Sequence, residues 1–326
     1  MKRRSFLATS LASSLLSLPV LAQSPAPQFP TRPVTMVVPY TAGGLTDVIG
    51  RVLAPRLAER WGQNVVVENR AGAGTTIGTA HVARAAGDGH TLLLTAFGYI
   101  GNQIMMPQLP YDPRALAPLA MVADSPSVLY VSAKLPVKSL AELIAYGKAN
   151  PGKLTFASSG NASSPHIAAE QFADMAGIQI VHVPYKGNGP AINDLLGGQV
   201  DALFDSPATM SHVATGKLKV LGHGYGQPHP RLPGVPPIRA AGVPALARFE
   251  AGGWFGLFIP SSTPDALQQR IHDDVRAVLQ GRDAAEAIGR TGVDPRIMTR
   301  AEYAAYLQAE LERWGPVIRS RNIRPD

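Results

Sequence analysis

Short apolar runs alternate along this chain with longer stretches in which apolar residues recur at helical spacing. In the first third, the runs at 34–38, 64–68 and 91–95 have the length of buried strands. Apolar residues three and four positions apart predict helices over 48–57 and 77–85. Because strand followed by helix repeats, we expect a parallel sheet with both faces covered.

The middle of the chain repeats this alternation with clearer helix signals. Ser139-x-x-Glu142 predicts one helix start, Ser164-Pro165 predicts another, and Gly177 marks an end. Further strands are expected at 153–157, 178–183, 200–204 and 218–221, and helices starting at Gly189-Pro190 and Ser206-Pro207. The last part of the chain adds a strand at 254–259 and helices at 264–279 and 299–314.

These two series predict two α/β units. The apolar segments 119–123 and 128–131 are expected to carry the chain from the first unit to the second, and 218–223 to carry it back. The predicted lobes are residues 23–125 with 225–326, and residues 126–224. A cleft between two such units is a common place for a small ligand.

The first 22 residues have the pattern of a cleavable signal peptide. Lys2, Arg3 and Arg4 precede an apolar run over 6–21, and the expected cut follows Ala22. The run is too short for a permanent membrane span. Arg3-Arg4 also resembles a twin-arginine signal, so the general secretory and twin-arginine routes both stay open. Either route predicts a periplasmic protein.

Composition narrows the functional classes. Loss of the signal leaves 27 of the 30 basic residues against 23 acidic ones, and no basic cluster follows, so nucleic acid is not an expected partner. The chain has no cysteine, so no disulfide and no thiolate chemistry is expected. Its eight histidines are dispersed, and no metal site or cofactor is predicted. No second long apolar segment occurs, which predicts a soluble mature chain.

A glycine-rich turn follows the first predicted strand. It comprises Tyr40, Thr41, Ala42, Gly43 and Gly44 and leads directly into a helix. Helix N-termini carry unpaired N–H groups and partial positive charge, which suits a bound anion. The two glycines would let that anion approach the backbone. The alternative is that they serve only the geometry of the turn.

Other polar residues, and the aromatic Phe97, fall near the points where strands end and helices begin. All are therefore expected at the same edge of their sheets. The candidate ligand-binding residues in this set are Asp47, Phe97, Ser158, Ser159, Asn161, Ser163, Ser164, His166, Tyr185 and Asp205. Each also has a structural interpretation: Asp47 as a capping residue, Phe97 as core, the serines as helix caps, and His166 as a packed histidine. No catalytic residue is predicted.

Enzyme motifs are absent from the sequence. It contains no G-x-S-x-G elbow, S-x-x-K, H-E-x-x-H or P-loop. The segment 72–78 misses dinucleotide-loop spacing by one residue. One rival hypothesis is an exported hydrolase that uses Ser159 or Ser206 with His166 as base, which requires the base within hydrogen-bond reach of the serine.

Several motifs in order resemble a known family. They are Pro39–Gly44 with Asp47 and Arg51, Glu68–Gly74 with Ile77-Gly78, Gly87–Leu93, Val183–Gly187, Gly197–Asp201, and Gly253–Gly256 through Pro264. Together they resemble the substrate-binding proteins of tripartite tricarboxylate transporters, the Bug receptors. The sequence departs from the usual pattern at Ala71, Thr75 and His90.

The resemblance implies an α/β fold of the type II periplasmic binding protein class, with two lobes joined by two crossing strands. It implies capture of a small organic acid (a dicarboxylate, an amino acid or an aromatic carboxylate) as the lobes close. Tyr40 to Gly44 would hold a carboxylate through main-chain groups, and the Ser158–His166 loop and the turn at Asp205 would add polar groups. The expected partner is a membrane permease or, alternatively, a sensor kinase without transport.

Overall fold

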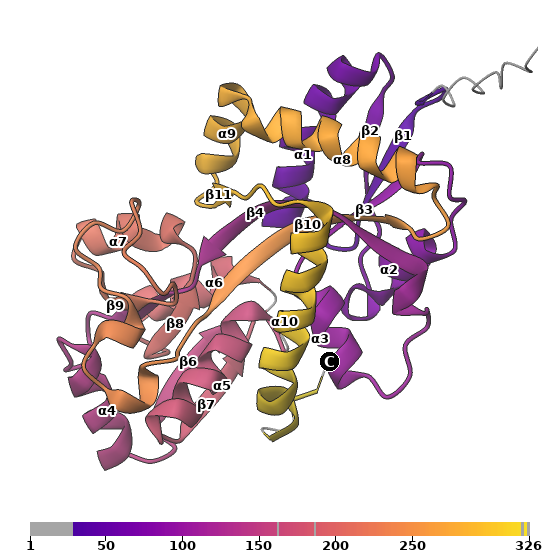
Figure 1. Ribbon diagram of the computed structural model, residues 1–326. Coiled ribbons are helices and arrows are strands. Elements are labelled where there is room, and N and C mark those ends of the chain that lie inside the picture. Colours follow the sequence, from indigo (N-terminus) through magenta and orange to yellow (C-terminus); the bar gives the residue numbers. More distant parts are fainter. Residues whose placement is uncertain (1–28, 162, 186, 321–322, 325–326) are drawn as a thin grey trace, which may run out of the picture.

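The computed structural model describes residues 29–161, 163–185, 187–320 and 323–324, which form two sheets with helices packed around them (Figure 1). The predicted signal peptide and its cleavage site lie outside these residues. No helix within the described ranges combines the length and apolar character that a membrane crossing requires.

The first sheet has six strands in the order β11-β4-β10-β3-β1-β2. The strands are β1 (Val34–Val38), β2 (Val65–Asn69), β3 (Thr91–Thr95), β4 (Leu116–Pro126), β10 (Gly252–Pro260) and β11 (Asp294–Pro295). Pairing is parallel among β1, β2 and β3, and antiparallel where β10 meets β3 and where β4 meets β10 and β11. The parallel part therefore comprises the strands for which the sequence predicts strand–helix repeats.

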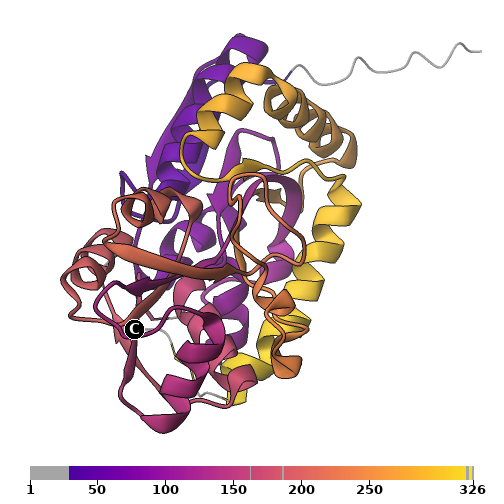
Figure 2. The ribbon, with the colours of Figure 1, turned by 90° about the vertical axis from the view of Figure 1, so that its left-hand side faces the viewer.

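The helices of this first half cover its sheet. They are α1 (Leu45–Trp61), α2 (Thr76–Ala83), α3 (Gly98–Met105), α8 (Asp265–Gln280), α9 (Arg282–Gly289) and α10 (Arg300–Ser320). The last helix begins with a capping box, because the Glu302 N–H donates to Thr299 Oγ1 and the Thr299 N–H donates to the Glu302 carboxylate. It runs along both halves and contacts α3 and α5 (Ser164–Ala176), as Figure 2 shows from the side.

The second sheet has five strands in the order β7-β6-β8-β5-β9. The strands are β5 (Val128–Ser132), β6 (Leu154–Ser158), β7 (Ile180–Pro184), β8 (Ala202–Asp205) and β9 (Leu218–His223). Besides α5, its helices are α4 (Leu140–Ala149), α6 (Asn188–Gly197) and α7 (Met210–Ala214). Pairing is parallel for β6 with β7 and β8, and antiparallel for β5 with β8 and β9.

Each half has its own apolar core. One cluster of the first half packs Met36, Ile49, Leu53 and Leu92, all without solvent exposure, between the sheet and α1. The helical positions are spaced as the apolar periodicity predicts, which places them on one face. In the second half, Phe156, Phe172 and Phe204 pack in a single ring cluster.

The chain returns to the first sheet later than predicted. After β9, the segment before β10 carries Ile238, Leu246, Phe249 and Ala251 into the core cluster of the second half. Figure 1 shows this orange segment at the end of the molecule that holds β9 and α4. Its apolar side chains thus pack with the second lobe, although the predicted lobes assign residues 225–326 to the first.

Two helices were missed by the sequence patterns, and one boundary moves. The segment α3 contains Gly98 and Gly101, and glycine disfavours helix interiors. The short α9 follows α8 directly after Gly281. The cap of α5 is Ser163 instead of Ser164, which shifts the helix start by one residue.

Candidate functional site

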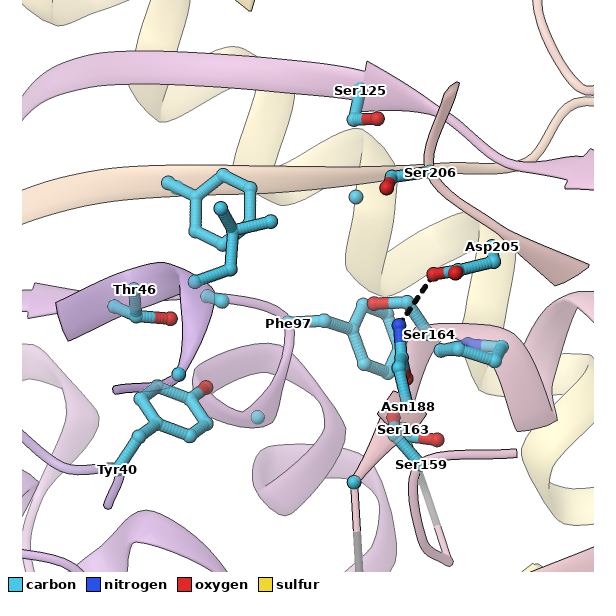
Figure 3. Close-up of a pocket in the computed structure, with 18 of the residues that line it drawn as sticks. Tyr40, Thr46, Phe97, Ser125, Ser159, Ser163, Ser164, Asn188, Asp205 and Ser206 are labelled. Atoms are coloured by element: carbon cyan, nitrogen blue, oxygen red, sulfur yellow. Dashed lines mark hydrogen bonds between the residues drawn. The ribbon is translucent and has the colours of Figure 1, made fainter. Parts of the chain in front are cut away.

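A cavity of about 700 Å³ lies between the two sheets. Its walls come from the turns at the starts of α1 and α3 in the first half and of α5 and α6 in the second (Figure 3). The strands that cross between the halves close its back with Ser125, Pro126, Ser127, Gly253 and Phe255. Helix starts from both halves thus face one cleft, as the positions of the polar turns predict.

The first wall is a turn fixed by one buried carboxylate. Asp47, 2% exposed, accepts hydrogen bonds from the Gly43 N–H at 2.8 Å, from Arg51 Nε at 3.0 Å and from Asn69 Nδ2 at 2.9 Å. Asn69 Nδ2 also donates to the Tyr40 carbonyl at 3.2 Å. The loop before α1 is therefore held in place from behind.

This network determines which backbone groups point to the cavity. Gly43 adopts a left-handed conformation, with φ +81°, and its N–H is engaged by Asp47. The first helical bond runs from the Val48 N–H to the Gly44 carbonyl. The N–H groups of Leu45 and Thr46 precede that bond and have no intrahelical acceptor. Both residues line the cavity, together with Thr41 and Gly44.

Asp47 is ionised, and its negative charge is paired with Arg51 within this wall. Burial favours its neutral form, but hydrogen bonds from Arg51, Gly43 and Asn69 outweigh that effect and lower the pKa of Asp47. It is not among the described residues that line the cavity. Its negative charge therefore pairs with Arg51 and does not face a ligand.

Aromatic and amide side chains complete the first wall. Tyr40 lines the cavity, and burial raises the pKa of its hydroxyl. Phe97, 3% exposed, lies at the start of α3 with its ring edge-on to Trp314, 5.8 Å between centroids. Asn102 Nδ2 donates to the Gly74 carbonyl at 2.6 Å and to Thr75 Oγ1 at 3.1 Å.

The second wall presents hydroxyl and amide side chains. Ser159, Asn161, Ser163 and Ser164 line the cavity at the start of α5. Ser163 Oγ donates to the Gly160 carbonyl at 2.7 Å, which closes the loop before the helix. Figure 3 shows these serines on the opposite side of the view from Tyr40 and Thr46.

Asp205 ends β8 at the same wall and is 7% exposed. Its Oδ1 accepts from Asn188 Nδ2, and its Oδ2 accepts from Thr209 Oγ1 at 2.6 Å. The Ser206 N–H is a third donor to this carboxyl. Burial raises the pKa of Asp205, and the three donors oppose that shift. Both Asp205 and Asn188 line the cavity.

Five predicted site residues do not line the cavity within the described part of the chain. Besides Asp47, they are Ala42, Ser158, His166 and Tyr185. Ser158 is fully buried, and its Oγ lies 2.6 Å from His182 Nε2. Tyr185 turns to α6, where its hydroxyl donates to Asp194 at 2.6 Å. Ser158 and Tyr185 therefore support the wall from behind, whereas Ala42 is exposed to solvent.

His166 is packed against another histidine. Its ring stacks on His182 with centroids 3.5 Å apart and planes 4° from parallel. Burial, with a smaller effect of His182, lowers the pKa of His166 to about 3, so the ring is neutral at neutral pH. Ser159 and Ser206 line the cavity, whereas His166 is not among the described lining residues and its ring packs on His182.

Sequence reasoning missed several lining residues. Asn188, Ser125 and Ser127 are not among the predicted site residues, and Gly189 is predicted only at a helix start. Thr46, Thr75 and Asn102 also face the cavity. A polar residue at the first position of a helix that follows a strand is a signal that would have found Asn188.

The charge of the cavity lining is unusual for an anion site. Within the described ranges, its lining contains no Lys, Arg or His side chain, and Asp205 is its one acidic residue. Groups of three or more His, Asp or Glu side chains that could hold a metal ion do not occur in this part of the chain either. Among the described lining groups, those with partial positive charge are therefore helix N-termini and other N–H groups.

The sequence matches a known family over most of its length. A family model described as "Tripartite tricarboxylate transporter family receptor" matches residues 49–323. This chain belongs to that family. Protein BugT of Bordetella pertussis (strain Tohama I) is 38% identical over 319 residues, which cover 96% of this chain and 95% of BugT.

Solved structures agree with this assignment. Rpa4515 of R. palustris, with adipate, is 33% identical with a TM-score of 0.80, covering 91% of this chain and 100% of that one. MatC from Rhodopseudomonas palustris, with bound malate, is 31% identical with a TM-score of 0.76, covering 89% and 100%. The predicted family and the predicted two-lobed periplasmic binding protein fold are confirmed. The family is one of periplasmic solute-binding receptors.

Proposed function

We propose that this protein is a periplasmic receptor that binds a small carboxylate between its lobes and delivers it to the permease subunits of a tripartite tricarboxylate-type transporter. The observation that supports this most directly is the cavity lining, where helix starts from both lobes converge and the described residues offer no cationic side chain. N–H groups at helix N-termini bind anions because the macrodipole favours negative charge there.

We assign the first carboxylate to the turn before α1. The N–H groups of Leu45 and Thr46, with the side chains of Thr41 and Tyr40, are its proposed donors. The Asp47 network keeps this turn in one conformation before the ligand arrives, so little ordering entropy is lost on binding.

The second lobe supplies the remaining contacts. Ser159, Asn161, Ser163 and Ser164 are the proposed side-chain partners of the ligand's other polar end. Phe97 is proposed to cover the carbon chain between the two ends. Because these groups belong to both lobes, a ligand that touches all of them favours the closed arrangement, and binding shifts the population toward it.

The two solved relatives indicate a suitable size class. Adipate and malate, named with Rpa4515 and MatC, are both linear dicarboxylates. A cavity of about 700 Å³ accommodates such an acid with ordered water. We therefore propose short linear dicarboxylates as the first class to test.

The test is a ligand screen on the purified mature protein. Dicarboxylates, amino acids and aromatic acids are added singly, and thermal unfolding and calorimetric binding are measured. A true ligand at a hundred times its Kd is expected to stabilise the folded state by about 2.7 kcal/mol. The matching diamides, which keep the shape but lack charge, serve as controls. Equal shifts from acids and diamides, or no shift from any acid, contradict the proposal.

A further inference from the structure

One acidic side chain faces a cavity that otherwise suits anions. Asp205 is 7% exposed and lines the cavity. It is the last residue of β8, the middle strand of the second sheet. Its counterpart in the first wall, Asp47, is paired with Arg51 at 3.0 Å and does not line the cavity in the described structure. Among the described residues, no ion pair joins Asp205 to a cation. Its carboxyl oxygens thus present to a ligand acceptor character that no described cation compensates.

The hydrogen bonds of Asp205 leave it room for one more donor. An ionised carboxylate has about four acceptor positions on its two oxygens. Donors from the described residues use three: Asn188 Nδ2, Thr209 Oγ1 at 2.6 Å and the Ser206 N–H. Figure 3 shows Asp205 and Asn188 joined at the edge of the cavity, next to Ser164 and Ser206.

The same bonds orient the amide of Asn188. A carboxylate attracts the amide nitrogen and repels the amide oxygen, so Nδ2 is the atom that faces Asp205. The carbonyl oxygen of Asn188 is then directed away from Asp205. Both side chains line the cavity, so a ligand can meet the carboxyl of Asp205 with the amide of Asn188 beside it.

The chemistry that fits this pair is a hydrogen-bond donor. A second carboxylate placed beside Asp205 is repelled, and a bare methylene leaves a desolvated acceptor without a partner. A hydroxyl or an ammonium group satisfies it. We propose that Asp205, with Asn188, recognises a hydroxyl or ammonium substituent on the carbon chain of the bound acid, and that the receptor takes substituted dicarboxylates in preference to unsubstituted ones.

This inference rests on the proposed function, because it assumes that a carboxylate binds in the cavity. It adds a specificity that the first wall lacks. The first wall offers donors to any carboxylate, whereas the Asp205–Asn188 pair distinguishes acids by what their carbon chain carries. A site that hydrogen-bonds a polar group of its substrate strongly rejects analogues without that group. The buried protein group is then left without a hydrogen-bond partner.

The experiment compares matched acids on the full mature protein by calorimetry. The sets are succinate, malate and aspartate, and glutarate, 2-hydroxyglutarate and glutamate. In the wild type, at least one substituted acid is expected to bind about tenfold or more tightly than its unsubstituted analogue. In Asp205→Asn this ratio is expected to fall to within about threefold. The hydroxy and amino acids then report whether the natural donor is a hydroxyl or an ammonium group.

A matched control tests for damage to the lobe. Asp201 in the same lobe accepts from the Thr155 N–H at 2.9 Å and from Thr155 Oγ1 at 2.8 Å, and it is not among the cavity-lining residues described. Asp201→Asn is expected to keep the wild-type ratio. Because Asp205→Asn removes a buried acceptor and can destabilise the lobe, Asn188→Leu is measured beside it and is expected to reduce the ratio as well.

Two results overturn the inference, and they are distinguishable from failure of the proposed function. Equal affinity of the wild type for substituted and unsubstituted acids overturns it and leaves a carboxylate receptor in place. The same holds if both variants weaken all acids by one common factor, since the pair would then be only structural. If no acid of any class binds the wild type, the proposed function fails first and the inference fails with it.

Discussion

The two walls of the cavity handle a buried aspartate in opposite ways. In the first, Asp47 holds the turn from behind, with Arg51 and Asn69 as partners, and leaves only backbone and neutral groups at the surface of the cavity. In the second, Asp205 faces the cavity among serines and asparagines. Under the proposals above, the two walls have separate tasks: the first accepts a carboxylate of any kind, and the second responds to the rest of the ligand.

The difference has a physical origin in how each wall is assembled. Backbone N–H groups at a helix start are identical for every sequence, so a wall made of them recognises charge and little else. Side chains differ in donor and acceptor character, so a wall made of them can discriminate. We therefore expect damage to the first wall to weaken all ligands, and changes in the second to alter the order of preference.

The largest effect is expected from Asp47→Ala. The change leaves the Gly43 N–H, Arg51 and Asn69 without their shared acceptor, so the turn loses its fixed conformation. We expect the free energy of unfolding to fall by about 1–3 kcal/mol, and the affinity for every acid ligand to drop by about tenfold or more. Urea denaturation and calorimetry measure the two quantities.

Its control is Glu286→Ala, which breaks another ion pair with the same spacing of four residues. Arg282 and Glu286 have exposed side chains, 91% and 53%, and such pairs contribute little to stability. The control is expected to change stability by less than about 0.5 kcal/mol. Similar losses in both variants would show that the turn does not depend on Asp47.

Acid is expected to weaken the second wall before the first. His166 has a folded-state pKa of about 3 against an ordinary value of 6.5, so the unfolded chain binds more protons between these values. Its contribution to stability is therefore lost progressively as the pH falls below 6.5, by up to about 1.4 kcal/mol per pH unit. The pKa of Asp47 is lowered from 3.8, so its stabilisation persists until the pH falls below that value.

The measurement is the free energy of unfolding at pH 7, 6, 5 and 4.5 for the wild type and for His166→Phe. Phenylalanine keeps a flat ring against His182 but cannot take up a proton. The variant is expected to lose less stability on acidification than the wild type does. Parallel curves for the two proteins would exclude His166 as a source of the acid sensitivity.

The smallest effect is expected from Ser164→Ala. This hydroxyl lines the cavity at the start of α5, and one hydrogen bond to a ligand contributes about 0.5–1.5 kcal/mol. Affinity is expected to fall by about twofold to tenfold, with thermal stability unchanged. Ser211→Ala, at an exposed serine whose Oγ donates to the Ala208 carbonyl, is the control. No loss of affinity in Ser164→Ala would remove this serine from the proposed ligand contacts.

The sequence by itself determined most of the helices and strands and the order of the polar turns. Apolar runs such as Leu92–Leu94 can only be buried, and signals such as Thr299-x-x-Glu302 act within a few residues, so local physics decides them. The motifs around Gly43 and Trp254 pointed to the family. The convergence of strand-to-helix turns also followed from the sequence, because parallel strands end at one edge.

Only the tertiary structure decided which of those polar residues face the cavity. Asp47 and Asp205 look alike in the sequence, each at a strand–helix junction, and their roles differ because Arg51 and Asn69 surround one while Asn188 and Thr209 surround the other. His166 is likewise a packed ring because His182, on another strand, lies against it. Burial and partners depend on residues far apart in the chain, so no local pattern specifies them.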